Sequence, residues 1–128
     1  MIVVDTNVMV YLLTGSGPAD RAASLFEKDP EWAAPPVLLS ELRNVMVGLL
    51  RRAEIEPWDA LDICEDAEAV LGDRVAAVPA APLLEAAIEG PLSAYDAEFV
   101  VLARRLRVPL VSADQAILRG ASDVAIPL

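Results

Sequence analysis

The sequence predicts an α/β fold in which helices cover both faces of a central, mainly parallel sheet. Short apolar segments rich in β-branched residues alternate with longer segments of helical periodicity, a pattern typical of strand-helix-strand units. The 128 residues are 55% hydrophobic and 23% charged, which suits one compact domain with a packed core and is too apolar for intrinsic disorder. No repeat, low-complexity tract or linker interrupts this alternation.

Five segments are expected to form the strands, because each is short, apolar and bounded by turn residues or prolines. The first stops at Asp5, and the second stops at Pro35 and Pro36. Parallel strands end at the same edge of a sheet, and ligands collect there. The expected strands are residues 1–4, 31–34, 74–78, 108–111 and 124–126.

Seven segments are expected to be helical, and prolines and glycines mark many of their limits. Pro57 suits the first turn of the fourth helix, and Gly72 ends it. The apolar stripe of this fourth helix, expected to face the core, consists of Trp58, Leu61, Cys64 and Leu71. The expected helices are residues 8–13, 18–28, 37–52, 57–71, 83–89, 93–107 and 115–119.

The charge balance is strongly acidic. Twenty Asp and Glu residues against ten Lys and Arg give a formal net charge of −10. Such a charge argues against a protein that coats nucleic acid through phosphate contacts alone. It does not exclude an enzyme that uses divalent cations, because sites for such ions are built from carboxylates.

Missing residue types narrow the chemistry further. The chain has no histidine, which excludes Ser-His-Asp and Cys-His catalysis and His-ligated zinc. Cys64 is the only cysteine, so no intramolecular disulfide can form. The uncharged run at residues 6–19 is shorter than the ~18 apolar residues of a membrane span and contains glycine and proline. We therefore expect a cytoplasmic protein without a signal peptide or membrane anchor.

Four acidic residues occur in surroundings unlike those of a solvated surface. Asp5 and Asp114 follow the first and fourth expected strands, and Glu41 and Asp96 share the apolar faces of their helices. An unpaired carboxylate on a face that packs against the core is expensive. These four residues are therefore the candidates for function.

Each of the four also has a purely structural interpretation. Asp5 and Asp114 could cap the helices that follow them, and Ser93-x-x-Asp96 matches a capping box. Glu41 could complement the helix dipole or pair with a neighbouring arginine, Arg43. Taken singly, these alternatives remain open.

Taken together, the four acids would converge on one rim of the sheet. Like charges a few ångströms apart cannot all ionise unless a cation holds them. Ligands that are oxygen atoms only, with no His or Cys among them, favour hard ions such as Mg²⁺ or Mn²⁺. The sequence thus predicts a carboxylate site for a divalent cation.

The segments around these acids resemble the motifs of PIN-domain ribonucleases, specifically the VapC-like toxin of VapBC-type toxin-antitoxin pairs. The four motifs occur in order over nearly the whole chain. One departure is Ser112, where the family more often has threonine, but the hydroxyl group is kept. The motifs are Val4-Asp5-Thr6-Asn7, Ser40-Glu41-Leu42-Arg43-Asn44-Val45, Tyr95-Asp96-Ala97 and Ser112-Ala113-Asp114.

The resemblance implies a three-layer α/β/α sandwich with a mainly parallel sheet of about five strands, formed by a single domain of residues 1–128. It implies hydrolysis of RNA phosphodiester bonds with one or two Mg²⁺ or Mn²⁺ ions, toxicity neutralised by a cognate antitoxin, and a homodimer. Asn7 and Ser112 would support the metal ligands by hydrogen bonds. The implied catalytic and metal-binding residues are Asp5, Glu41, Asp96 and Asp114.

RNA would have to be held locally by arginines, because the overall charge opposes its binding. Arg43 and Arg104 are the first candidates, although an ordinary surface or ion-pairing role is the more common one for such arginines. Further candidates are Arg51, Arg52, Arg105 and Arg107.

Other functions fit the residues less well. A receiver-like signalling domain needs a late lysine, but Lys28 is the only lysine. A haloacid-type phosphatase needs Asp-x-Asp after the first strand, but Asn7 occupies the second position. A PIN-like nuclease with a DNA-directed or RNA-maturation role stays possible. The main alternative is a catalytically inactive PIN-like module that binds RNA or protein.

Overall fold

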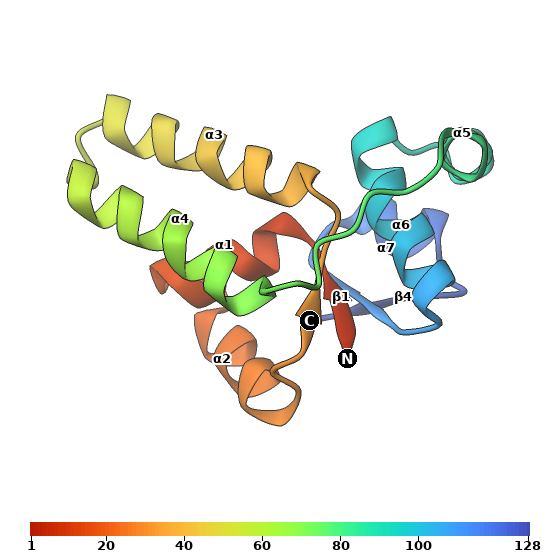
Figure 1. Cartoon of the computed structure of the whole chain (residues 1–128), viewed down its shortest axis with the longest axis horizontal. Coiled ribbons are helices and arrows are strands. Elements are labelled where there is room, and N and C mark those ends of the chain that lie inside the picture. The colour runs from red at the N-terminus through yellow and green to blue at the C-terminus, as the bar shows by residue number, and fades with distance from the viewer.

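The computed structural model describes residues 1–128 and contains a four-stranded, entirely parallel sheet (Figure 1). The strand order is β2-β1-β3-β4, and neighbouring strands pair Ile2 with Trp32, Val3 with Leu110, and Leu110 with Ala125. The α/β fold predicted from the sequence is therefore confirmed. The strands are β1 (Ile2–Val4), β2 (Trp32–Ala33), β3 (Leu110–Ser112) and β4 (Ala125–Pro127).

Seven helices flank the sheet. In Figure 1 the first four lie to the left of the strands and the last three to the right, which gives the layered arrangement expected of a sandwich. None of these helices is both long enough and apolar enough to cross a membrane. The helices are α1 (Thr6–Thr14), α2 (Ala19–Lys28), α3 (Val37–Arg51), α4 (Pro57–Leu71), α5 (Ala80–Glu89), α6 (Ala94–Leu106) and α7 (Gln115–Gly120).

The strand expected at residues 74–78 is reduced to a single parallel bridge between Ala34 and Val75. Ala34 donates its backbone N–H to Arg74 and accepts a hydrogen bond from the N–H of Ala76. The next bond of a parallel ladder would need an N–H at residue 36, but Pro36 has none. The sheet consequently has four strands instead of about five.

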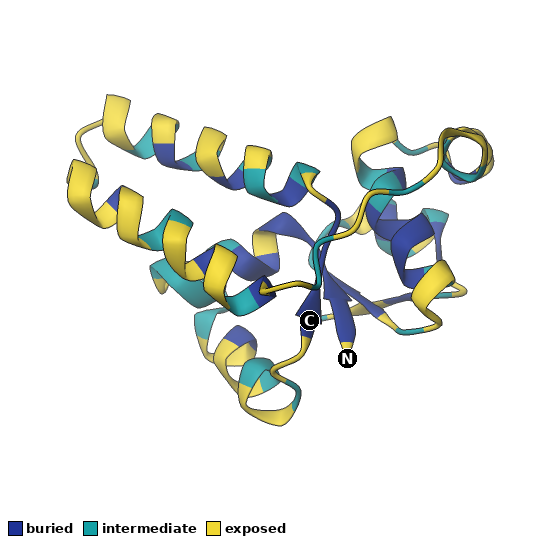
Figure 2. Cartoon of the chain, in the orientation of Figure 1, coloured by how far each residue is buried: buried dark blue, intermediate teal, exposed yellow.

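The core lies between the sheet and the helices, and α6 packs against β1, β3 and α5. Residues on several sides of α6 are buried, as Figure 2 shows, which is expected of a helix enclosed by other elements. Trp32, Phe99 and Met9 are the largest fully buried side chains. Because other elements hold α6 on several sides, Asp96 in its first turn is held in place as well.

The buried face of α4 agrees with the expected stripe at Leu71, and in part at the half-buried Cys64, but not at Trp58 and Leu61. Trp58 and Leu61 are 64% and 58% exposed, whereas Ala60, Ala67 and Leu71 are buried. The helix packs against α1 and α3, and the small alanine side chains let the helices approach closely. The sequence pattern assigned Trp58 and Leu61 to the buried stripe, but close packing places the smaller side chains of Ala60 and Ala67 there.

The two tryptophans provide a test of the core. Replacing Trp32 with alanine should lower the free energy of unfolding by about 3–5 kcal/mol, because a large, fully buried side chain is lost. The matched replacement of Trp58, which is mostly exposed, should change it by about 0.5 kcal/mol or less. Denaturant titration of both variants measures the difference, and equal losses would contradict the packing described.

A carboxylate-lined cleft as candidate functional site

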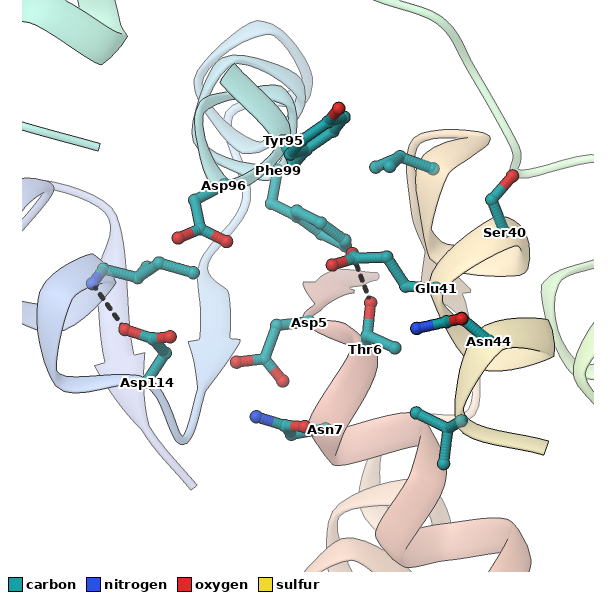
Figure 3. Close-up of a pocket in the computed structure, with 13 residues that line it drawn as sticks. Asp5, Thr6, Asn7, Ser40, Glu41, Asn44, Tyr95, Asp96, Phe99 and Asp114 are labelled. Carbon is teal, nitrogen blue, oxygen red and sulfur yellow. Dashed lines mark hydrogen bonds between the residues drawn. The ribbon is translucent and has the colours of Figure 1, made fainter. Parts of the chain in front are cut away.

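A cleft of about 550 Å³ opens between α3 and α6, at the carboxyl ends of β1 and β3 (Figure 3). All four candidate acids line it, and no lysine or arginine does. Four segments that are far apart in the sequence thus bring carboxylates to one place. The lining residues are Asp5, Thr6, Asn7, Val37, Ser40, Glu41, Asn44, Val45, Tyr95, Asp96, Phe99, Asp114 and Ile117.

Asp5 lies between β1 and α1 and is only 4% exposed. Its Oδ1 atom accepts a hydrogen bond from the N–H of Val8 at 2.9 Å, so it caps α1 as the structural interpretation proposed. Its Oδ2 atom accepts hydrogen bonds from the Ser112 hydroxyl at 2.5 Å and from the N–H of Ala113 at 3.1 Å. Three donors fix this carboxylate, which therefore has one orientation.

Ser112 and Asp114 form the continuation of this network at the end of β3. The fully buried Ser112 hydroxyl donates to Asp5 and accepts a hydrogen bond from the N–H of Asp114 at 3.0 Å. Asp114 caps α7 through its Oδ1 atom, which accepts from Ala116 and Ile117. Capping uses only one of its two oxygens, so the same residue can cap the helix and still present an oxygen to the cleft.

Glu41 lies on α3 and is held by a residue that the sequence analysis did not assign to the site. The Thr6 hydroxyl donates a hydrogen bond to Glu41 Oε1 at 2.8 Å. Arg43 pairs with Glu68 on α4, not with Glu41, and Glu41 lies beyond the first turn of α3. Neither structural alternative for Glu41 therefore applies.

Asp96 lies in the first turn of α6, where its N–H donates to the hydroxyl of the N-cap residue Ser93 at 3.0 Å. This is one half of the expected capping box. In Figure 3 the Asp96 carboxylate points into the cleft, toward Asp5 and Asp114. The capping role thus belongs to Ser93, and the Asp96 side chain is directed to the site.

The cleft raises the pKa of two of its acids. Burial is the main cause of the raised pKa of Asp5, and Asp114 adds to it, while hydrogen bonds from Ser112, Val8 and Ala113 oppose it. Burial also raises the pKa of Asp96, with further contributions from Asp114, Glu41 and Asp5. Both shifts have the same origin, which is negative charge in a partly desolvated site without a cationic side chain.

The other predicted site residues differ in whether they line the cleft. Asn7 lines the cleft, but no hydrogen bond joins it to another lining residue (Figure 3). Arg43 pairs with Glu68 at 3.2 Å, and Arg104 forms a two-point pair with Asp123 at 2.8 and 3.0 Å. Neither arginine lines the cleft. The structure therefore brings the acids together without these arginines.

Several lining residues were not singled out in the sequence. Ser40 and Asn44 flank Glu41 on the same wall, and Thr6 holds Glu41 in place. Each belongs to one of the four motifs, so their nearness to the acids was the available signal. Their polar side chains complete a lining in which oxygen and amide groups surround the carboxylates.

The donor set fits a hard divalent ion that keeps part of its water shell. All the charged groups of the cleft are carboxylates, and oxygen ligands are those that Mg²⁺ and Mn²⁺ prefer. No group of three or more acidic side chains is arranged to hold an ion by itself. Mg²⁺ is usually bound through one or two carboxylates plus water and substrate phosphates, so the spacing suits that kind of site better than an all-protein cage.

Comparisons with known proteins agree with this geometry. The family model described as PIN domain matches residues 2–122. Among solved structures, the crystal structure of PAE2754 from Pyrobaculum aerophilum superposes with a TM-score of 0.72 at 22% sequence identity, covering 98% of this chain and 89% of that one. At this identity the likeness concerns the fold alone. No curated protein matches the chain.

The raised pKa of Asp96 gives a testable pH dependence. The folded chain holds this proton more tightly than the unfolded chain, so stability falls as pH rises from the ordinary pKa of an aspartate through the raised pKa of the folded chain. Asp96→Asn removes the charge and should raise the melting temperature at pH 7 in metal-free buffer, with no gain at pH 3.5. Thermal unfolding at both pH values measures this, and a variant less stable than wild type at pH 7 would contradict it.

Proposed function

The chain belongs to the PIN-domain family, and from this we propose that it is a Mg²⁺- or Mn²⁺-dependent endoribonuclease that hydrolyses RNA phosphodiester bonds. PIN domains are usually nucleases and typically use divalent metal ions. The observation that carries the proposal is the convergence of Asp5, Glu41, Asp96 and Asp114 in one cleft without a cationic side chain. Such a cleft repels a phosphodiester unless a cation is bound.

The side chains of the cleft would have different roles in catalysis, depending on how each is held. Asp5, Asp96 and Asp114 would bind the metal ion directly or through water, and Glu41 would bind it or orient its water molecules. A divalent ion bound here supplies acidity to a water molecule and stabilises negative charge on the phosphate. Ser112 fixes Asp5, and Thr6 fixes Glu41, so that both carboxylates keep one orientation. Water would attack the phosphorus atom and the P–O3′ bond would break, which would leave 5′-phosphate and 3′-hydroxyl ends without any role for the RNA 2′-hydroxyl.

We further propose that a cognate antitoxin neutralises this activity. A second groove, of about 600 Å³, adjoins the cleft and shares Val45 with it. Its lining is mainly apolar, and its acidic residues are Glu54, Asp59 and Asp62. An apolar groove with acidic side chains complements a cationic amphipathic segment of a protein. Blocking this surface beside the cleft would restrain a growth-inhibiting toxin.

Self-association is the remaining part of the proposal. Leu84 and Ile88, one turn apart on α5, are 60% and 83% exposed. Exposed apolar side chains that share a helix face are typical of interaction surfaces, which supports a homodimer.

We place the protein in the cytoplasm, as expected for a chain whose single cysteine cannot form an internal disulfide.

Removing one carboxylate tests the catalytic proposal. Asp114→Asn should lower Mg²⁺-dependent cleavage of total cellular RNA by at least about 100-fold, because even the partners of metal ligands contribute about 10- to 100-fold. Asparagine can still cap α7, so folding should be kept. The control Asp66→Asn changes an exposed acid of α4 and should cleave as wild type does, with activity lost in EDTA. Undiminished cleavage by the Asp114 variant would remove this residue from catalysis.

A failure of the wild-type protein to cleave RNA would change the proposed function. If the folded wild-type protein with Mg²⁺ or Mn²⁺ cuts no cellular RNA, the inactive RNA- or protein-binding module replaces the nuclease as the function.

Ser112 tests the positioning of Asp5. Ser112→Ala should raise the Mg²⁺ concentration needed for half-maximal cleavage by about 10- to 100-fold, because Asp5 loses one of its three donors. Ser112→Thr keeps the hydroxyl and should restore the wild-type metal requirement. A titration of activity with Mg²⁺ distinguishes the two variants, and an unchanged requirement in the alanine variant would show that the hydrogen bond does not serve the metal site.

A further inference from the structure

Tyr95 lies at the cleft without serving the fold. It lines the cleft beside Asp96, yet its side chain is 64% exposed. Its ring pairs with no other aromatic ring, and it is not among the side chains packed against the core. No hydrogen bond joins it to another lining residue (Figure 3). A large aromatic ring is thus left in contact with solvent next to the carboxylates.

The position of Tyr95 on α6 directs it toward the cleft. Phe99 lies one turn further along the same helix face, lines the same cleft and is 1% exposed. This face of α6 therefore runs from the core at Phe99 to solvent at Tyr95. Because Phe99 is fixed by the core and Ser93 caps the helix, the backbone that carries Tyr95 is held in place.

The opposite wall, on α3, offers polar groups with no partner within the cleft. Ser40 and Asn44 are exposed, lie one turn apart and line the cleft. Figure 3 shows them across the cleft from Tyr95, with no hydrogen bond to another lining residue. The Asn44 amide carries donors and an acceptor on one planar group, as the edge of a nucleobase does.

Cationic side chains cannot supply the affinity of this cleft for a nucleotide. No lysine or arginine lines it, and Arg43 and Arg104 are paired with acids elsewhere. Apart from the phosphate, a nucleotide has to be held by neutral interactions, of which stacking on an aromatic ring tolerates every base. RNA-binding proteins commonly combine such stacking with hydrogen bonds to the edge of an unpaired base.

We propose that the cleft between α3 and α6 binds one unpaired nucleobase of the RNA substrate, with Tyr95 stacking on its face and Asn44 contacting its edge. The inference rests on the proposed function, since it assumes that RNA enters the cleft. A base in a duplex has its face stacked on neighbouring bases and its edge paired, so both contacts require an unpaired base. The enzyme therefore selects single-stranded RNA at this position, and Asn44 biases the choice of base.

Equilibrium binding tests the stacking role separately from catalysis. Fluorescence anisotropy measures the affinity of fluorescein-labelled ten-nucleotide homopolymers of A, C or U, in a buffer with Ca²⁺ in place of Mg²⁺. Tyr95→Ala should weaken binding of all three by about 5- to 150-fold, the loss of one stacked base. Tyr95→Phe keeps the ring and should bind as wild type does. Trp58→Ala removes an aromatic side chain of equal exposure outside the cleft and should also bind normally.

Asn44 should act differently from Tyr95. Asn44→Ala should alter the ranking of the three homopolymers, because it removes contacts that depend on the base, whereas Tyr95→Ala should keep the ranking. A duplex of the same length should bind wild type more weakly than the single strands do. Melting temperatures close to that of wild type would show that the variants are folded.

The outcomes separate this inference from the nuclease proposal. The base-binding role is overturned if Tyr95→Ala and wild type bind RNA with equal affinity, or if wild type binds duplex and single strands with equal affinity. If the same wild-type preparation still cleaves RNA in Mg²⁺, the nuclease proposal stands. If wild type neither binds nor cleaves RNA, both proposals fail.

Discussion

The site depends on one buried hydrogen bond, which joins the Ser112 hydroxyl at the end of β3 to the Asp5 carboxylate at the end of β1. The two residues are 107 positions apart, and the parallel pairing of β1 with β3 brings them together. A buried carboxylate is tolerated only when donors satisfy it. Ser112, Val8 and Ala113 provide those donors, and Ser112 also accepts from Asp114. The hydrogen bonds that stabilise the buried Asp5 carboxylate therefore also orient Asp114.

Hydrogen bonds orient the side chains of this cluster, but they do not neutralise its negative charge. Asp5 and Asp96 have raised pKa values because burial and neighbouring acids disfavour ionisation, and no cationic side chain lines the cleft. The fold thus holds a local electrostatic strain that a divalent ion would relieve. Local conflicts of this kind are expected at functional sites, where stability is lost for the sake of activity. The same excess of acid is the reason that the proposed base-binding role falls to neutral groups such as Tyr95 and Asn44.

The alternation of strands and helices was readable from the sequence because local periodicity determines it, and the four acids were readable because each lay in an apolar or strand-end context. Long-range partners were not readable. Pro36 limits the pairing of residues 74–78 to the single bridge between Ala34 and Val75, but this effect can be recognised only once the two segments are known to be neighbours. Thr6 holds Glu41 from 35 positions away, and Arg43 is paired with an acid 25 positions away. Sequence patterns identify which residues are unusual, but the tertiary fold decides their partners.

Anomalous diffraction from crystals soaked in Mn²⁺ tests most directly whether the cleft is a divalent-cation site. The proposed metal site predicts a manganese peak in the cleft, beside the carboxylates of Asp5, Asp96 and Asp114, with water completing the coordination. In crystals of Asp96→Asn the peak should be weaker or absent. A wild-type crystal at saturating Mn²⁺ with no peak in the cleft, or with peaks only at surface acids such as those of α4, would contradict the account.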